Sequence, residues 1–176
     1  MPEAAANCEI RQAGIPDAKV LAMLGVVTFY EAYFEQDSAG DLANYVVETF
    51  DADKIAAELA DPAVTYLIAY RGEKAVGYAK LIRDAREEGV SGVRPIELKR
   101  IYTVERVWGT GVGLALLDHC RSLAKSEGFD TLWLGVWQEN QRGQSFYRKH
   151  GFRKVGTITF PYGDSVGIND VLEKRL

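Results

Sequence analysis

The sequence has few cysteines and histidines and no excess of positive charge, and these shortages argue against several classes of protein. Its two cysteines, Cys8 and Cys120, form neither a disulfide framework nor the spacing of a metal site. The net charge of −4 argues against nucleic-acid binding, which needs a basic face. No apolar run is long enough to span a membrane, and the first residues lack the basic and apolar regions of a signal peptide. We therefore expect a soluble, cytoplasmic protein without a bound metal.

The first half of the 176 residues is mostly helical in pattern. Residues 8–13 alternate like a short strand. Three helical segments follow between Pro16 and Pro62, and the first of them runs into the aromatic stretch TFYEAYFEQ. Residues 64–70 and 74–85 are rich in β-forming residues around RGEK, which predicts a hairpin.

The second half alternates strands and helices. The pattern predicts a strand up to Val104, a helix at 112–125 with Cys120 in its apolar stripe, and an apolar strand at 131–137 that is buried on both faces. A short helix ends at Gly151, and an antiparallel strand pair completes the chain. The order predicts an α+β fold with a mixed sheet, in which the central strand–helix–strand unit is a right-handed parallel crossover.

The turn WGTGVGLALL, residues 108–117, is the first candidate binding element. Its glycines do not have the spacing of the dinucleotide fingerprint, and no Gly-Lys-Ser/Thr follows as in a P-loop. A strand, a glycine turn and a helix start nevertheless form a site for an anion, because backbone N–H groups and the helix dipole face it. A tight connection without a ligand is the alternative.

Three motifs in order, LKRIYTVERVWGTGVGLALL, LWLGVWQEN and SFYRKHGF, resemble the GCN5-related N-acetyltransferase (GNAT) family. The resemblance implies one domain over residues 1–176, with a central, mostly antiparallel sheet, one parallel strand pair and flanking helices. It also implies acetyl-CoA as acetyl donor, with its pyrophosphate on the glycine turn and its pantetheine arm in a slot where residues 101–104 splay from residues 132–137. The family has Gln or Arg where this chain has Trp108, which removes a polar group from the phosphate end. The cofactor-binding residues implied are Ile101, Tyr102, Thr103, Val104, Gly109, Thr110, Gly111, Val112, Gly113, Leu114, Asn140 and Tyr147.

The same resemblance implies the catalytic groups. Tyr147 would give a proton to the departing thiolate as general acid, and a backbone N–H near Tyr102 would polarise the thioester carbonyl. Without the family motif, Tyr147 would be read as a core tyrosine beside Phe146. The base is not implied by the resemblance: Glu97 is the candidate because it lies on the strand that leads to the cofactor and could accept a proton directly or through water, with a water chain without a dedicated base or a polar residue at a sheet edge as alternatives.

The early aromatic stretch extends the resemblance toward the PaiA-type bacterial spermidine/spermine N-acetyltransferases. Aromatic faces and carboxylates both attract an ammonium group, so we expect a primary amine of a polyamine as acceptor. An aromatic core with a solvated acidic face is the alternative for these residues. Other acceptors remain open: a protein N-terminus or lysine, an amino acid, or an aminoglycoside. A non-catalytic acyl-CoA-binding module also remains open as an alternative function. The glycine spacing disfavours a nicotinamide dehydrogenase. The terminal strands could offer an edge for a homodimer. The predicted acceptor-binding residues are Phe29, Tyr30, Glu31, Tyr33 and Phe34.

Overall fold

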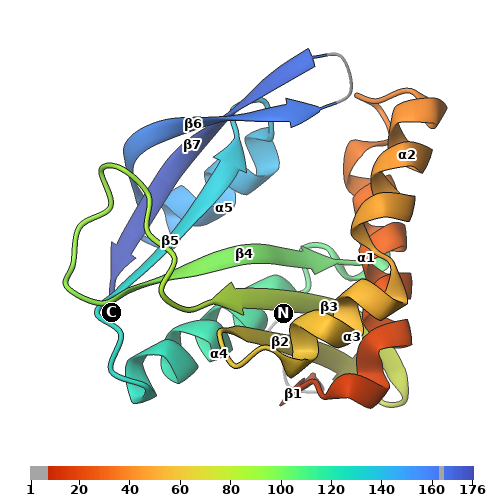
Figure 1. The fold of residues 1–176 in the computed structure, drawn as a ribbon, viewed down its shortest axis with the longest axis horizontal. Helices are drawn as coiled ribbons and strands as arrows, with labels where there is room; N and C mark the ends of the chain where they lie inside the picture. Colours follow the sequence, from red (N-terminus) through yellow and green to blue (C-terminus); the bar gives the residue numbers. More distant parts are fainter. Residues whose placement is uncertain (1–7, 163–164) are drawn as a thin grey trace. The chain divides into compact units, whose positions relative to one another are not determined.

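The computed structural model describes residues 8–162 and 165–176. Seven strands form one sheet in the order β1-β2-β3-β4-β5-β7-β6 (Figure 1). The β4–β5 pair is parallel, and β5–β7, β7–β6 and β1–β2 are antiparallel. The predicted mixed α/β sheet of GNAT type, mostly antiparallel with one parallel pair, is confirmed. The elements are β1 Glu9–Gln12, α1 Ala18–Tyr33, α2 Ala39–Thr49, α3 Ala52–Ala60, β2 Val64–Arg71, β3 Lys74–Ile82, β4 Pro95–Thr103, α4 Val112–Ser126, β5 Thr131–Trp137, α5 Gln141–Lys149, β6 Arg153–Tyr162 and β7 Ser165–Arg175, with short 3-10 turns at Ile15–Asp17 and Glu105–Val107.

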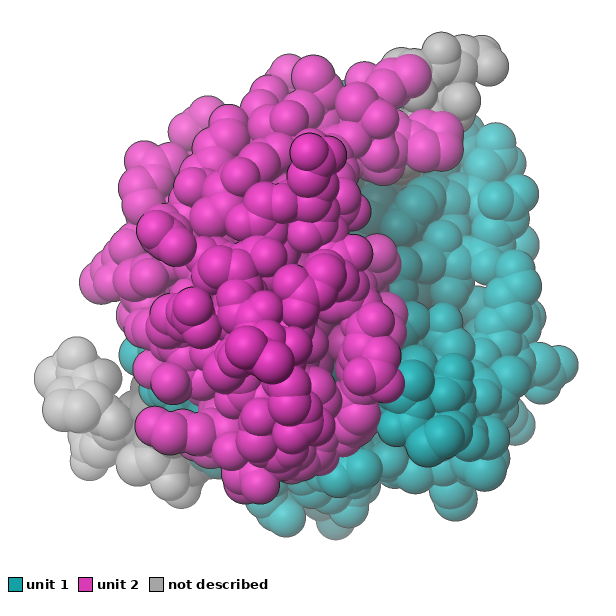
Figure 2. Space-filling model, turned by 60° about the vertical axis from the view of Figure 1, so that its left-hand side comes forward, with its two compact units in different colours: residues 1–81, 100–120 teal, residues 82–99, 121–176 magenta. Residues whose placement is uncertain are grey.

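Backbone contacts group the chain into two compact units, which Figure 2 colours separately. Unit 1 contains residues 1–81 and 100–120, and unit 2 contains residues 82–99 and 121–176. The chain passes from one unit to the other at the end of β3, within β4 and within α4. A single domain over the whole chain remains a prediction, and each unit is described by itself below.

In unit 1, alternate residues of β3 meet helices from opposite sides, because successive side chains of a strand point to opposite faces. Lys80 reaches Glu58 of α3, with 2.7 Å between Nζ and Oε1. On the other side, Gly77 lies against Leu116 of α4. Cys120, on the same helix, is fully buried as predicted. Burial raises the pKa of its thiol to about 12, so that it is a small core residue and not a reactive one.

Two helices of unit 1, α2 and α3, begin at capping residues. The Ser38 hydroxyl accepts a hydrogen bond from the Asp41 N–H, 3.2 Å away, at the start of α2. Asp51 does the same for α3, accepting from the N–H groups of Asp53 and Lys54. Each cap satisfies N–H groups that the first helical turn leaves without a partner. These caps explain why the polar segment between α1 and β2 forms two separate short helices.

In unit 2, β7 pairs with β5 on one side and with β6 on the other. Trp133 of β5 packs against Val90 and Val171, and its indole N–H donates to the carbonyl of Ala85 over 2.9 Å. The long loop before β4 is therefore packed on the sheet. The Glu173 carboxylate, 1% exposed, fixes the same loop by accepting hydrogen bonds from the N–H and hydroxyl of Ser91, at 2.6 and 2.8 Å.

Candidate active site

The glycine turn between β4 and α4 is held in a conformation that favours glycine. Gly109 and Gly111 have φ angles of 73° and 91°, in the left-handed region where a side chain is strained. A Cβ added at Gly109 would meet no atom within 4 Å. The turn therefore leaves open space at this glycine, and the backbone there is accessible to a ligand.

The first turn of α4 supplies hydrogen-bond donors beside that space. The first backbone bond of the helix runs from the Ala115 N–H to the Gly111 carbonyl, at 2.9 Å. The N–H groups of residues 112–114 precede it and have no intrahelical acceptor. Together with the positive end of the helix dipole they form an anion-binding site, and the residues present fit a diphosphate.

Two side-chain contacts attach this turn to the ends of β4 and β2. Trp108, where the family has Gln or Arg, donates its indole N–H to the Thr103 carbonyl at the end of β4, over 2.9 Å. The Thr110 hydroxyl donates to the Val107 carbonyl at 2.7 Å and accepts from Nη2 of Arg71 at 2.8 Å. The sequence indicated only that Trp108 removes a polar group; the structure adds that the indole fastens the turn to β4.

The end of β4 has one edge engaged with β3. The Val104 N–H donates to the Val76 carbonyl at 3.0 Å. The recorded ladder between β4 and β5 pairs residues 95–97 with 131–133, near the start of both strands. The splay predicted beyond this ladder, and with it the pantetheine slot, involves both units and stays a prediction.

The five predicted acceptor residues divide into an inner and an outer group. Phe29 is buried and stacks on Tyr45 of α2, with ring centroids 4.3 Å apart. The Tyr33 hydroxyl shares a hydrogen bond of 3.3 Å with that of Tyr102. Both inner residues serve the packing of α1, which is the alternative role that the sequence left open. Their predicted role in acceptor binding stays a prediction.

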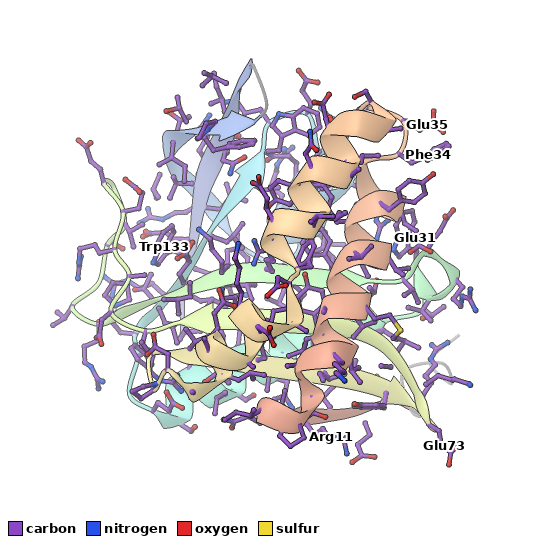
Figure 3. All side chains as sticks on the ribbon, turned by 45° about the vertical axis from the view of Figure 1, so that its right-hand side comes forward. Arg11, Glu31, Phe34, Glu35, Glu73 and Trp133 are labelled. Atoms are coloured by element: carbon purple, nitrogen blue, oxygen red, sulfur yellow. The ribbon has the colours of Figure 1, made fainter. Side chains whose placement is uncertain are left out.

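The outer group lies at the C-terminal end of α1. Tyr30 and Phe34 are 49% and 56% exposed, and their rings meet edge to face at 5.4 Å. Glu31 accepts a hydrogen bond from the Glu105 N–H at 2.7 Å, so its carboxylate helps to hold the start of the glycine turn. Figure 3 shows Phe34 and Glu35 together at this end of the helix. Exposed aromatic and acidic groups are thus adjacent here.

A polar cluster beneath α1–α3 escaped the sequence analysis. The half-buried Arg100 lies over the Phe50 ring, with its guanidinium carbon 5.2 Å from the ring centroid, and hydrogen-bonds to Tyr45. Burial lowers the pKa of Arg100, but the surrounding tyrosine oxygens outweigh it and raise the pKa overall, so the group is cationic. The fully buried Tyr78 hydroxyl has no hydrogen-bond partner among the described residues. These residues come from β3, β4 and α2 with its C-terminal cap, so no local pattern in the sequence indicates the cluster.

Unit 2 holds the remaining predicted residues. Glu97 is buried, and its Oε1 lies 3.2 Å from the Lys99 Nζ. The Asn140 side chain caps α5 by accepting from the Gly143 N–H at 2.8 Å. Tyr147 is buried between the rings of Phe146 and Phe152, with centroid distances of 5.3 and 5.5 Å. Asn140 therefore has a clear structural role besides the predicted one, and the ring of Tyr147 is held in one orientation by its neighbours.

A scan against protein families matches residues 26–152 to the acetyltransferase (GNAT) family. The chain belongs to this GNAT family. An uncharacterised N-acetyltransferase of Mycobacterium tuberculosis is 35% identical over 147 residues, which cover 84% of this chain and 90% of the relative. Another, from Lactobacillus delbrueckii subsp. lactis, is 30% identical over 151 residues, covering 85% and 86%. This GNAT protein is an acetyl-CoA-dependent N-acetyltransferase.

Two solved structures share the GNAT fold. The PaiA N-acetyltransferase of Thermoplasma acidophilum, in complex with coenzyme A, has a TM-score of 0.80 and 22% identity, covering 96% of this chain and 99% of its own. The ribosomal-protein-S18-alanine N-acetyltransferase of Escherichia coli has a TM-score of 0.69 and 15% identity, covering 96% and 93%. At these identities the likeness extends to the fold alone, so the acceptor has to be argued from this chain's own residues.

The residues of this GNAT protein that the resemblance assigned to acetyl-CoA are distributed over both units. Residues 101–104 and 109–114 belong to unit 1 with the outer group of α1, whereas Glu97, Asn140 and Tyr147 belong to unit 2. Among the described residues there is no cluster of three or more His, Cys, Asp or Glu side chains that could hold a metal ion. Over the same residues, no helix is long and apolar enough to cross a membrane.

Proposed function

We propose that the chain transfers the acetyl group of acetyl-CoA to a primary amine of a polyamine such as spermidine or spermine. The observation that supports this acceptor is the C-terminal end of α1, where the exposed rings of Tyr30 and Phe34 meet and the exposed Glu35 follows Phe34 in the chain. A polyamine carries several ammonium groups along a flexible chain. An aromatic face and a carboxylate each attract one such group, so the outer group would hold the part of the acceptor that does not react.

In this proposal the glycine turn holds the pyrophosphate through the N–H groups at the start of α4. The backbone of residues 101–104 pairs with the pantetheine amides, and an N–H near Tyr102 polarises the thioester carbonyl. Asn140 hydrogen-bonds the cofactor, and Tyr147 donates a proton to the departing thiolate. Glu97, directly or through water, removes the proton from the ammonium so that the amine can attack.

The first test is a product assay. The purified protein is incubated with acetyl-CoA and spermidine, and the polyamine is followed by mass spectrometry. Rapid formation of a singly acetylated product is the expected result. Coenzyme A binding without an acetylated polyamine would reject this acceptor while leaving the donor site in place.

A pair of charge variants makes the test specific to α1. Glu35→Gln removes the carboxylate that follows the outer group in the chain and should raise the KM for spermidine by about two- to fivefold, because an exposed pair with an ammonium contributes roughly 0.5–1 kcal/mol. Glu73→Gln, in the exposed β2–β3 turn at a distance from α1 in Figure 3, is the matched control and should leave the KM unchanged. Equal effects of both substitutions would show that only net charge matters.

The Arg100 cluster favours a second candidate acceptor, an amine that also carries a carboxylate. A half-buried cation beside the unpartnered Tyr78 hydroxyl is suited to a carboxylate and unsuited to another ammonium. Amino acids and short peptides therefore belong in the same assay as spermidine. Acetylation of these alone, lost in Arg100→Gln, would select the second candidate.

A further inference from the structure

Arg71, the last residue of β2, reaches the glycine turn although 39 residues separate it from Thr110. Its Nη2 donates to the Thr110 hydroxyl oxygen at 2.8 Å, and that hydroxyl donates onward to the Val107 carbonyl at 2.7 Å. A hydroxyl group has one hydrogen to donate, and here it is committed to the carbonyl. In its bond with the guanidinium the hydroxyl oxygen is therefore the acceptor. The two bonds fix the side chain of Thr110 and the backbone of the turn together.

The same contact brings a permanent positive charge to the turn. Arginine remains protonated at any pH at which the protein is folded, so a positive charge stays at the turn while the planar group holds the Thr110 hydroxyl. The turn itself contributes only backbone dipoles, because Trp108 uses its single donor on the Thr103 carbonyl. Arg71 is thus a full charge placed against the turn where the family's usual polar side chain is absent.

We infer that Arg71 is a positioning residue for the donor: it holds the glycine turn in its anion-binding conformation and adds the charge that Trp108 cannot supply. The inference rests on the proposed placement of the acetyl-CoA pyrophosphate at this turn and is independent of the acceptor. It explains how the chain accommodates tryptophan at the start of the turn. In this inference the role of the missing polar group is taken by a residue of β2, which β3 separates from β4 in the sheet.

The test measures coenzyme A binding by calorimetry, without any acceptor, so that it does not depend on which amine is acetylated. Arg71→Met should raise the Kd for coenzyme A about tenfold, since a hydrogen bond or ion pair with a charged group is worth about 1.5 kcal/mol or more. Arg11→Met is the control: Arg11 is an exposed arginine of the same unit, stacked on Tyr70, and its loss changes the net charge equally. An unchanged Kd in Arg71→Met, or an equal rise in both variants, would overturn the inference.

Two further readouts separate positioning at the pyrophosphate from a general loss of structure. 3′-Dephospho-coenzyme A keeps the pyrophosphate but lacks the terminal phosphate, and Arg71→Met should weaken its binding by the same factor as for coenzyme A. A loss confined to coenzyme A would assign Arg71 to the 3′-phosphate and contradict the inference. Rising salt should weaken binding to the unmodified protein more steeply than to Arg71→Met, because salt screens a charge that the variant no longer has.

The contact between Arg71 and Thr110 is tested by a double-mutant cycle. Thr110→Val removes both hydrogen bonds of the hydroxyl and should also raise the Kd, and Arg71→Met with Thr110→Val should bind no more weakly than the worse single variant. Fully additive losses would mean that the two residues act separately. If Arg71→Met melts below the assay temperature, Arg71→Lys takes its place: it keeps the charge without the guanidinium geometry, and an unchanged Kd there would remove the positioning role.

Discussion

A single methyl group at Gly109 should separate the stability of the glycine turn from its capacity to bind. Gly109 has a φ of 73°, and a Cβ there meets no atom within 4 Å. Gly109→Ala therefore costs the fold only the strain of a left-handed residue, about 1–2 kcal/mol. For a chain of this length each kcal/mol lowers the melting temperature by about 2–4 °C. The protein should stay folded.

Binding of the donor should suffer much more. We propose that the pyrophosphate reaches the N–H groups of α4 through the open space at Gly109. A methyl group in that space would keep the phosphate away from these N–H groups. Loss of one charge-assisted hydrogen bond costs about 1.5–3 kcal/mol, so the Kd for coenzyme A should rise roughly 10- to 150-fold. Calorimetry with coenzyme A, together with a thermal unfolding curve, measures both quantities on the same sample.

Gly72→Ala is the matched control. Gly72 has a φ of 56° in the β2–β3 turn, and a Cβ there also meets nothing within 4 Å. Both variants should lose a similar amount of stability, while Gly72→Ala keeps the affinity of the unmodified protein. If the two variants bind coenzyme A equally well, the assignment of the pyrophosphate to the glycine turn is refuted.

Three other outcomes follow from the structure. Tyr147→Phe keeps the ring between Phe146 and Phe152, so coenzyme A affinity should be retained while kcat falls by about 10²-fold or more; undiminished turnover would remove Tyr147 from the mechanism. Glu173→Gln should cost about 2–3 kcal/mol in urea unfolding, because the buried carboxylate accepts charge-assisted bonds from Ser91 and Arg153. Burial raises the pKa of Glu173, but these bonds outweigh it and hold the pKa below its ordinary 4.5, so the stabilisation is present above pH 4.5 and is lost as the pH falls through the lowered value; a variant with unchanged acid sensitivity would contradict this. Gly25→Ala drives a methyl group into the packed Phe50 ring and should cost about 1–3 kcal/mol by the same assay, whereas a neutral result would mean that α1 and α2 separate without strain.

The helices and strands that the sequence predicts correctly are those with a local pattern of apolar residues. Residues 112–125 show helical spacing, and α4 spans Val112–Ser126. The apolar run 131–137 coincides with β5 and is largely buried on both faces, as expected for a central strand. The parallel pairing of β4 with β5 follows from the rule that a helix joins parallel neighbours. The helix and the strand were predicted from spacings shorter than about twenty residues, and the pairing was predicted from the order of the elements.

The functional contacts that the sequence missed are long-range. Arg71 meets Thr110 across 39 residues, and Glu31 meets the Glu105 N–H across 74. Neither pair leaves a periodic signal, because its geometry depends on how whole strands and helices pack. Helix α1 shows the same limit. Val26 and Val27 are exposed while Phe29 is buried, so apolar residues lie on more than one side of this helix. The sequence pattern therefore could not predict which aromatic rings are in the core and which are exposed to an acceptor.

The two edge strands of the sheet, β1 and β6, influence whether copies of the protein associate at high concentration. An unpaired strand is a template for adding another chain, and both ends of this sheet resist that. β1 is four residues long and exposes Glu9 and Arg11. β6 is interrupted by an irregularity between Lys154 and Gly156, and Pro161 lacks an N–H to donate. A short, charged edge strand and an irregular edge strand both oppose the addition of further chains to the sheet. Concentrated samples of the protein should therefore not form fibres.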